Sequence, residues 1–390
     1  MKKVLALVVA ALMLASLMAG TVLAEEPAAE GGEVAVSEWE IPVLSAITGP
    51  VSFVGEPAIW AANYAAEKIN AEGGIEGVPV KIVPYDTEFD PQKGMQYITQ
   101  LQDTALFIGG CVAAPVCEAE AQILYEEHIP NIGSYVSTAL DEYAPYICAY
   151  MGDSEILDLE LCKQWLEAKG YEKLVMFYSP DDTAQAATVE RFAQEVPQYV
   201  GAVEVPTGTI DCGPLAVQAM NMGADAFWLG CRTDEAAKCC KELVERGAVE
   251  SGEQIYATFA AMGAGFLEIT GETAEGTYAY NMLDVDCPEA TWQELSEAYK
   301  ADHNGDAPTY PPIQGFYNMI VALKACFEDL HITGDPAKLA EEREAIAEWL
   351  NNSPEIQGCQ GPFSWMNGVM QIEAPVVQVQ DGKYVVVTME

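Results

Sequence analysis

Short apolar runs alternate along the chain with segments in which apolar or small residues recur at helical spacing. Strand-like runs occur at 41–47, 80–85, 105–109 and 129–133, and again at 174–178, 203–209, 226–230 and 255–259. Helical patterns lie between them, near 57–70, 91–102 and 116–127 in the first series and near 154–169, 184–196, 214–222 and 234–246 in the second. Such alternation with short connections indicates parallel sheets covered by helices on both faces. Two series predict an α/β protein with two doubly wound lobes.

The last third of the chain breaks this alternation. Helical patterns follow one another at 289–301, 312–329 and 336–351, and strand-like runs return only at 376–379 and 384–387. We expect the three helices to return to the first lobe and the final strands to join the second. The predicted lobe 1 therefore consists of residues 41–156 and 285–372, and lobe 2 of residues 157–284 and 373–390.

A glycine-rich stretch, EKINAEGGIEGVPVKIVPYDTEFDP at 67–91, suggests phosphate binding at first sight. The dinucleotide fingerprint places its glycines after a strand and before a helix, whereas here they follow a helix and precede a strand. Gly73 or Gly74 is therefore predicted to end the helix in the left-handed region, and Gly77 to lead into the strand. Asp86 then ends that strand, where its short side chain can brace neighbouring loop amides.

The first forty residues predict export. Residues 1–24 combine a basic start, an apolar core and the small-residue end Val22-Leu23-Ala24, which is the pattern of a secretory signal peptide. No cysteine stands at the cleavage point, so lipoprotein processing is not indicated. Residues 25–40 are acidic, small and turn-prone, and we expect a disordered leader there. The protein is therefore expected in the periplasm or outside the cell.

Charge narrows the range of partners. The chain carries 60 acidic and 18 basic residues, a formal net charge of −42. Nucleic acid and anionic lipid require a basic patch, so neither is expected as a partner. The acids are spread along the chain and do not take the spacing of a calcium loop, which favours a solvated acidic surface over a cation site.

Cysteine and histidine do not form a metal motif. The chain has eleven cysteines and three histidines, and C-x-x-C does not occur. No histidine is spaced near cysteines as zinc ligands would be, so neither a metal nor another cofactor is expected. Most thiols are predicted to be small core residues. Export would permit one or two disulfides, and the sequence leaves the pairing open.

A family resemblance covers nearly all of residues 41–390. The opening segment has a Gly-Pro turn, a further Gly, a helix ending in Ile-Asn-x-x-Gly-Gly-Ile-x-Gly, a strand and then Asp. It resembles the extracellular solute-binding proteins of branched-chain amino acid ABC transporters, and the likeness continues through GADAFWLGCRTDEAAKCCKELVERG to GPFSW near the end. The resemblance implies a type I periplasmic-binding fold, in which two lobes joined by three crossovers close on a small molecule.

The resemblance also implies ligand positions in the first lobe. Relatives hold the ligand carboxylate with a serine near 113–115 and an alanine–x–threonine motif near 135–138. This chain has Ala113 and Ala114 in the first motif, which leaves only backbone N–H groups, and Ser137 and Thr138 in the second. An aromatic residue commonly lies near Phe53, and Tyr135 adds a second ring. The alternatives are that Ser137 and Thr138 cap the next helix and that Phe53 belongs to the hinge-side core.

In the second lobe, relatives place an aromatic ring near Thr183, a tyrosine near Arg232 and an acid near Phe259 or Ala260. That acid normally pairs with the ligand ammonium, and here it is absent. Because an unpaired buried ammonium is costly, a carboxylate or aromatic acid is expected rather than free leucine. One of Asp181, Asp182, Asp234 and Glu235 could still supply the acid. Alternatively, Arg232 is a surface partner of Asp234 or Glu235.

Three classes of function remain to be compared. A secreted hydrolase is disfavoured, because G-x-S-x-G and H-E-x-x-H are absent and histidines are few. A ligand sensor of the same fold usually carries a transmembrane or output segment, which the sequence does not contain. The favoured function is therefore a non-enzymatic receptor that delivers a small solute, an amino acid or organic acid, to an ABC transporter permease.

Overall fold

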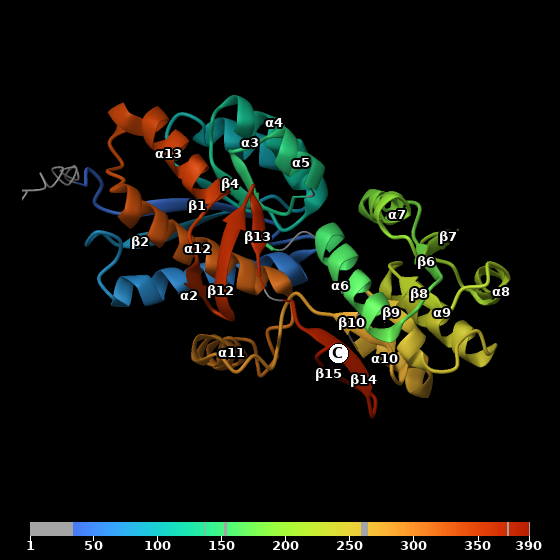
Figure 1. Ribbon diagram of the computed structural model, residues 1–390. Helices are drawn as coiled ribbons and strands as arrows, with labels where there is room; N and C mark the ends of the chain where they lie inside the picture. The colour runs from blue at the N-terminus through green and yellow to red at the C-terminus, as the bar shows by residue number, and fades with distance from the viewer. Residues whose placement is uncertain (1–33, 136, 152–153, 259–263, 373, 390) are drawn as a thin grey trace, which may run out of the picture.

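The computed structural model describes residues 34–135, 137–151, 154–258, 264–372 and 374–389. The predicted signal peptide and most of the leader lie outside these residues, as does Phe259. Two lobes stand side by side in Figure 1, each built around its own sheet. The chain passes between them after β5 (Ile147–Ala149), after β10 (Tyr278–Tyr280), and between β13 (Val369–Gln371) and β14 (Val376–Gln380).

Lobe 1 contains a five-stranded parallel sheet with the order β2-β1-β3-β4-β5. Its other strands are β1 (Trp39–Ser45), β2 (Val80–Asp86), β3 (Ile108–Gly109) and β4 (Asn131–Gly133). The helices around it are α2 (Ser52–Ala71), α3 (Pro91–Leu101), α4 (Ala114–Glu126), α5 (Ser137–Glu142), α11 (Ala290–Asp302), α12 (Pro311–Leu330) and α13 (Leu339–Asn351).

Lobe 2 contains a seven-stranded sheet with the order β15-β14-β10-β9-β8-β6-β7. Strands β6 (Leu174–Tyr178), β7 (Tyr199–Glu204), β8 (Ala226–Leu229), β9 (Ile255–Ala257) and β10 are parallel, while β14 and β15 (Lys383–Val386) are antiparallel. The helices are α6 (Ser154–Lys169), α7 (Thr183–Glu195), α8 (Gly213–Asn221), α9 (Thr233–Glu245) and α10 (Ala264–Thr270).

A third, antiparallel sheet of β11 (Ile356–Gly358), β12 (Gly361–Met366) and β13 rests against the end of the first sheet. Trp365 donates its indole N–H to the Ala149 carbonyl at 2.7 Å, and the Ala149 N–H donates to the Gly368 carbonyl at 2.8 Å. These bonds attach the small sheet to β5, next to the first crossing between the lobes.

Each main sheet separates two hydrophobic cores. On β1, Val43 faces the core under α2 and α12, whereas Leu44 faces the core under α4. On β6, Val175 faces one hydrophobic core of lobe 2 and Leu174 faces the other. Successive strand residues point to opposite faces, so a strand buried on both faces needs an unbroken apolar run. This is why the two series of apolar runs identify the strands.

The glycine-rich stretch forms a turn, as predicted. Gly73, Gly74 and Gly77 have φ of 111°, 81° and 80°, and the Gly74 N–H donates to the Ile69 carbonyl at 2.9 Å. A Cβ on Gly74 would lie 2.1 Å from the Val78 carbonyl oxygen. The Asn70 side chain then clamps the helix to the strand through two bonds of 2.7 Å with Val80.

The structure also shows the state of the cysteines and the apolarity of the helices. All eleven cysteines are free and buried, which agrees with small core residues and leaves none of them bridged. Within the described ranges, no helix has the length and apolarity needed to span a bilayer.

Candidate functional site

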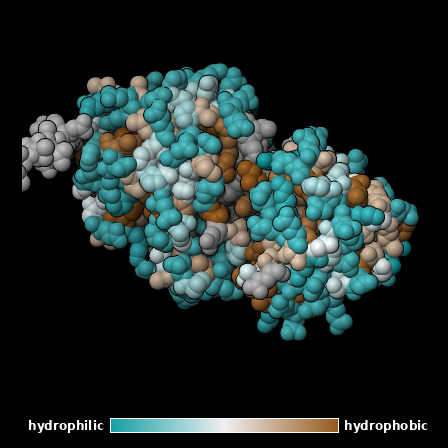
Figure 2. All heavy atoms as spheres, viewed as in Figure 1, coloured by the Kyte–Doolittle hydropathy of each residue, from teal (hydrophilic) through white to brown (hydrophobic). Residues whose placement is uncertain are grey.

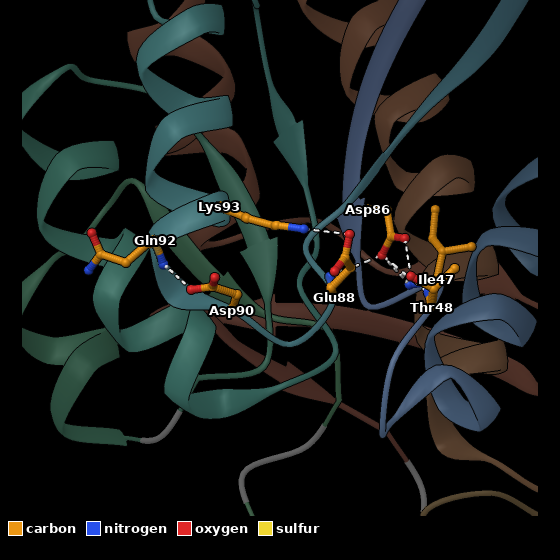
Figure 3. Close-up of polar contacts among 7 residues, drawn as sticks. All are labelled: Ile47, Thr48, Asp86, Glu88, Asp90, Gln92 and Lys93. Carbon is orange, nitrogen blue, oxygen red and sulfur yellow. Dashed lines mark hydrogen bonds and ion pairs between the residues drawn. The ribbon is translucent and has the colours of Figure 1, made fainter.

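The carboxyl edge of the lobe 1 sheet is organised by Asp86 (Figure 3). Its Oδ1 accepts the N–H groups of Ile47, Thr48 and Glu88 at 3.0, 3.2 and 3.0 Å, and its Oδ2 accepts the Thr48 hydroxyl at 2.6 Å. Burial opposes ionisation, but these hydrogen bonds outweigh it and lower the pKa of Asp86. The predicted bracing role is confirmed: one carboxylate joins the loops that follow β1 and β2.

The next loop leads from β3 into α4 and contains Ala113 and Ala114. Ala113 is buried and is the N-cap of α4, with no side-chain cap. Its N–H contributes to the lowered pKa of the neighbouring Cys111 thiol. Ala114 opens the helix and Pro115 follows it without an N–H.

The loop after β4 reaches α5, which begins at Ser137 and continues through Thr138. This agrees with the alternative that these residues sit at the start of a helix. Tyr135 is only 7% exposed, and its hydroxyl donates to Asn131 Oδ1 at 2.7 Å. Burial raises the pKa of Tyr135 well above its usual value. The ring therefore supports the loop from inside, instead of lining an open surface.

Asn131 connects the two loops at the level of the sheet. Its Nδ2 donates to the carbonyls of Ile108 and Gly110 at 2.6 and 2.9 Å, while its Oδ1 accepts from Tyr135. The side chain is buried. The β3–α4 and β4–α5 loops are consequently held together at the same edge.

Phe53 lies near the start of α2, directly after the β1 loop. Its side chain is 55% exposed and meets Tyr310 edge-on, with ring centroids 5.6 Å apart. The alternative of a hinge-side core position is wrong. An exposed pair of rings at this edge is compatible with an aromatic contact surface.

In lobe 2, Thr183 is the first residue of α7. The two aspartates before it are occupied locally: Asp181 accepts the Thr207 N–H at 3.2 Å, and Asp182 accepts the Gln185 N–H at 3.3 Å. Hydrogen bonds from Thr207 and the charge of Arg232 lower the pKa of Asp181.

Arg232 is exposed, and its Nε donates to the Thr207 hydroxyl at 2.9 Å. The suggested pairing with Glu235 is wrong, because Glu235 is buried and accepts the Gly208 N–H at 2.7 Å. The other suggested partner, Asp234, is exposed in the first turn of α9. Arg232 thus belongs to the rim of the β7–α8 loop.

Two residues at the carboxyl edge of the second sheet were not predicted. Ser179 follows β6 and Thr258 follows β9, and both hydroxyl oxygens are buried without a hydrogen-bond partner among the residues that the structure describes. The Thr258 N–H donates to the Leu229 carbonyl at 3.1 Å, which fixes its place beside β8. A hydroxyl residue directly after a buried strand is a pattern that the sequence does display.

The boundary between the lobes is indented, and hydrophobic residues gather on both sides of it within a mostly hydrophilic surface (Figure 2). A cavity of about 300 Å³ lies between the lobes. Leu140, Asp141 and Met366 line it from lobe 1, and Ile156 and Arg191 line it from lobe 2. Among the described residues, no group of three or more His, Cys, Asp and Glu side chains is placed to hold a metal ion.

Comparison with known proteins identifies the family. The sequence profile of the periplasmic binding protein family matches residues 38–383. The Leu/Ile/Val-binding protein homolog 3 of Brucella melitensis is 24% identical over 85% of this chain and 88% of its own length. The Leu/Ile/Val-binding protein of Escherichia coli K12 is 29% identical over 91 residues, so the match spans only 25% of that protein's length.

Solved structures show the same fold. A leucine binding protein from Thermotoga maritima is 19% identical, with a TM-score of 0.68 over 90% of this chain and 98% of its own. A solute binding protein of an ABC transporter from Rhodopseudomonas palustris, solved with 4-hydroxybenzoate, is 18% identical, with a TM-score of 0.65 over 90% and 95%. The expected type I periplasmic-binding fold is confirmed, and with it the resemblance to solute-binding proteins, which are not enzymes.

Proposed function

The chain belongs to the periplasmic binding protein family, and we propose that it captures a small carboxylate-bearing solute between its lobes and delivers it to an ABC transporter permease. The observation that carries this proposal is the joining of two loops at one edge of the lobe 1 sheet. The β3–α4 and β4–α5 loops are fixed to each other through Asn131, and each opens a helix. Helix starts present N–H groups to an anion.

The starts of α4 and α5 together form the proposed solute cradle. The backbone N–H groups of Ala113 and Ala114 and the first residues of α5, Ser137 and Thr138, are the proposed carboxylate donors. Phe53, which is exposed with Tyr310 at the same edge, is the proposed contact for the body of the solute. The bound 4-hydroxybenzoate in the Rhodopseudomonas palustris protein supports an aromatic acid.

Lobe 2 supplies the opposite wall in this proposal. We assign Thr183, at the start of α7, and Arg232, beside Thr207, to the edge of this wall. The buried hydroxyls of Ser179 and Thr258 belong to its inner layer. We take the predicted bodies, residues 41–156 with 285–372 and 157–284 with 373–390, as the two moving bodies, except that α6 belongs to lobe 2 from its first residue, Ser154. A solute that contacts both lobes binds the closed form more strongly, and therefore shifts the hinge equilibrium toward closure.

Export is part of the same proposal. The family name and the predicted signal peptide at residues 1–24 both support a mature protein that begins near Glu25 in the periplasm. N-terminal sequencing of protein recovered from the periplasm tests this point. A mature chain that retains Met1 contradicts it.

A thermal-shift screen tests the solute class. Benzoate-type acids, aliphatic carboxylates, leucine, isoleucine and valine are each added to the purified protein. A true ligand at 100 times its dissociation constant stabilises the protein by about 2.7 kcal/mol. We expect aromatic acids to give the largest shift, and the Ser137→Ala, Thr138→Ala double variant to lose most of it.

The control variant is Thr99→Ala, which removes an exposed hydroxyl bonded within α3 and keeps the shift. If leucine, isoleucine or valine stabilises the protein as strongly as an aromatic acid, the solute class is wrong and an acid from a neighbouring loop, Asp181 or Asp182 first, pairs with the ammonium. If no carboxylate shifts the melting temperature, the proposal of a carboxylate receptor fails.

A further inference from the structure

Two thiols meet beneath the β3–α4 loop, one on each side of the start of α4. Cys111 precedes the helix and Cys117 lies in its first turns, and both are fully buried. The Cys117 sulfur lies 3.3 Å from the backbone nitrogen of Cys111 and 3.2 Å from its carbonyl oxygen. We propose that Cys111 and Cys117 form an oxidisable pair, which a peroxide converts to a disulfide.

The surroundings of Cys111 favour its thiolate. The Thr87 hydroxyl lies 4.0 Å from its sulfur. The Cys117 thiol lowers the pKa of Cys111, and the Ala113 N–H, the Thr87 hydroxyl and the Val112 N–H add to this effect, although burial acts in the opposite direction. Backbone N–H groups at a helix start favour the thiolate form of a nearby cysteine.

The pKa of Cys117 is shifted in the opposite direction to that of Cys111. Its sulfur donates to the Cys111 carbonyl at 3.2 Å, and burial raises its pKa well above the usual value. It therefore holds its proton more tightly than Cys111 does. One thiolate and one adjacent thiol are what a two-step oxidation requires.

The chemistry is balanced with hydrogen peroxide as the oxidant. The Cys111 thiolate attacks one oxygen, the O–O bond breaks, and hydroxide leaves, so that Cys111 becomes a sulfenic acid. The Cys117 sulfur then attacks the Cys111 sulfur, and its proton leaves with the hydroxyl group as water. The hydroxide takes up the proton that Cys111 released on ionising and becomes the second water. The two thiols thus lose two electrons and two protons in total, and the peroxide is reduced to two waters.

Oxidation would also remove a loop contact. In the reduced protein, Cys117 Sγ accepts the N–H groups of Cys111 and Ser134, both at 3.3 Å. One thiol thereby ties the β3–α4 loop to the β4–α5 loop. A disulfide turns this sulfur toward Cys111 and releases the Ser134 N–H. If the proposed solute cradle is correct, on which this step rests, oxidation weakens solute binding.

Peptide mapping by mass spectrometry tests the pair in the intact protein. After mild peroxide treatment, we expect one peptide containing both Cys111 and Cys117 to have lost two hydrogen atoms. The Cys117→Ser variant should instead accumulate a Cys111 sulfenic acid that a cyclic dione traps, and the Cys111→Ser variant should give neither product. Cys326→Ala is the matched control, because that buried thiol on α12 lies outside the pair and its removal leaves the disulfide unchanged.

Three further thiols in lobe 2, Cys212, Cys231 and Cys239, are also in contact. A disulfide formed there first, or oxidation of Cys111 no faster than that of Cys326 in the wild-type protein, overturns the assignment. The solute affinity of the oxidised protein should fall by about tenfold. An unchanged affinity overturns the link to the cradle, whereas failure of the reduced protein to bind any carboxylate counts against the proposed function and leaves the mapping result valid.

Discussion

Replacing Asp86 tests whether one carboxylate organises the carboxyl edge of lobe 1. The Asp86→Ala variant leaves three backbone N–H groups and the Thr48 hydroxyl without their acceptor. A hydrogen bond to a charged group contributes about 1.5–3 kcal/mol when shielded. Water can replace part of this network, because the contacts with Thr48 and Glu88 are exposed. We therefore expect a loss of about 3 kcal/mol in the free energy of unfolding, well below the sum of four full contributions.

The Asp86→Asn variant is the matched comparison. Its amide oxygen can still accept the three N–H groups at the Oδ1 position, but its NH₂ group cannot accept the Thr48 hydroxyl. The expected loss is about 1 kcal/mol. Thr48→Val removes the same hydroxyl from the other side and should cost a similar amount, since both variants delete the 2.6 Å bond.

The pH dependence has a definite sign. The pKa of Asp86 is lower in the folded protein than in the unfolded chain, so its contribution is fully present above the unfolded value, about 3.9. That contribution is lost as the pH falls through the folded pKa. Urea denaturation at pH 7 and pH 3 measures the effect. The reasoning is refuted if alanine costs no more than asparagine at pH 7, or if the difference between wild type and Asp86→Asn grows as the pH falls.

Three other substitutions probe lobe 1, each by urea denaturation. Glu120→Gln should raise stability at pH 7, because burial raises the pKa of this carboxyl, whose Oε1 has no hydrogen-bond partner among the described residues. The free energy of unfolding of the wild type should fall with rising pH above the unfolded pKa of Glu120, by up to about 1.4 kcal/mol per pH unit. The same slope in the variant would contradict this. Gly55→Ala should cost about 2 kcal/mol or more, since a Cβ there would lie 2.1 Å from the Ala46 carbonyl oxygen, whereas Gly265→Ala, with its nearest neighbour at 3.7 Å, should cost little. Arg343→Met should cost about 3 kcal/mol, because the buried guanidinium holds the carbonyls of Ala105, Gln102 and Glu127, and Arg343→Lys should fail to restore it.

The fold could be predicted because long elements leave strong periodic patterns. Strands such as β1 and β6 and helices such as α12 are buried over several residues in succession. The three-residue strands β5 and β10 were not predicted, although β4 and β9, which have the same length, were, so length alone does not decide which strands a pattern reveals. The predicted strand at 203–209 is also wrong: β7 is Tyr199–Glu204, and the chain turns at Pro206 just beyond it.

The role of Asp86 was predictable from its position at the end of an apolar run, where a short carboxylate can accept loop N–H groups. Its partners Ile47 and Thr48, which lie 39 and 38 positions away, could not be named from the sequence. The partner of Arg232 is Thr207, 25 positions away, and nothing in the sequence distinguishes it from the nearer Asp234. The burial of Tyr135 likewise depends on Asn131, whose own partners come from another strand.

The contacts of Cys117 show why such a site escapes a linear reading. The sulfur meets Cys111 six positions before it and Ser134 seventeen positions after it, and the second contact forms because β3 and β4 are neighbours in the sheet. The loops carry the polar groups while the two cores under each sheet remain apolar and closed. Lobe motion can therefore alter contacts between loops of opposite lobes without disturbing either core. The same separation confines the effect of a new bond at Cys117 to the loops, so its oxidation should change solute affinity far more than it changes the unfolding of lobe 1.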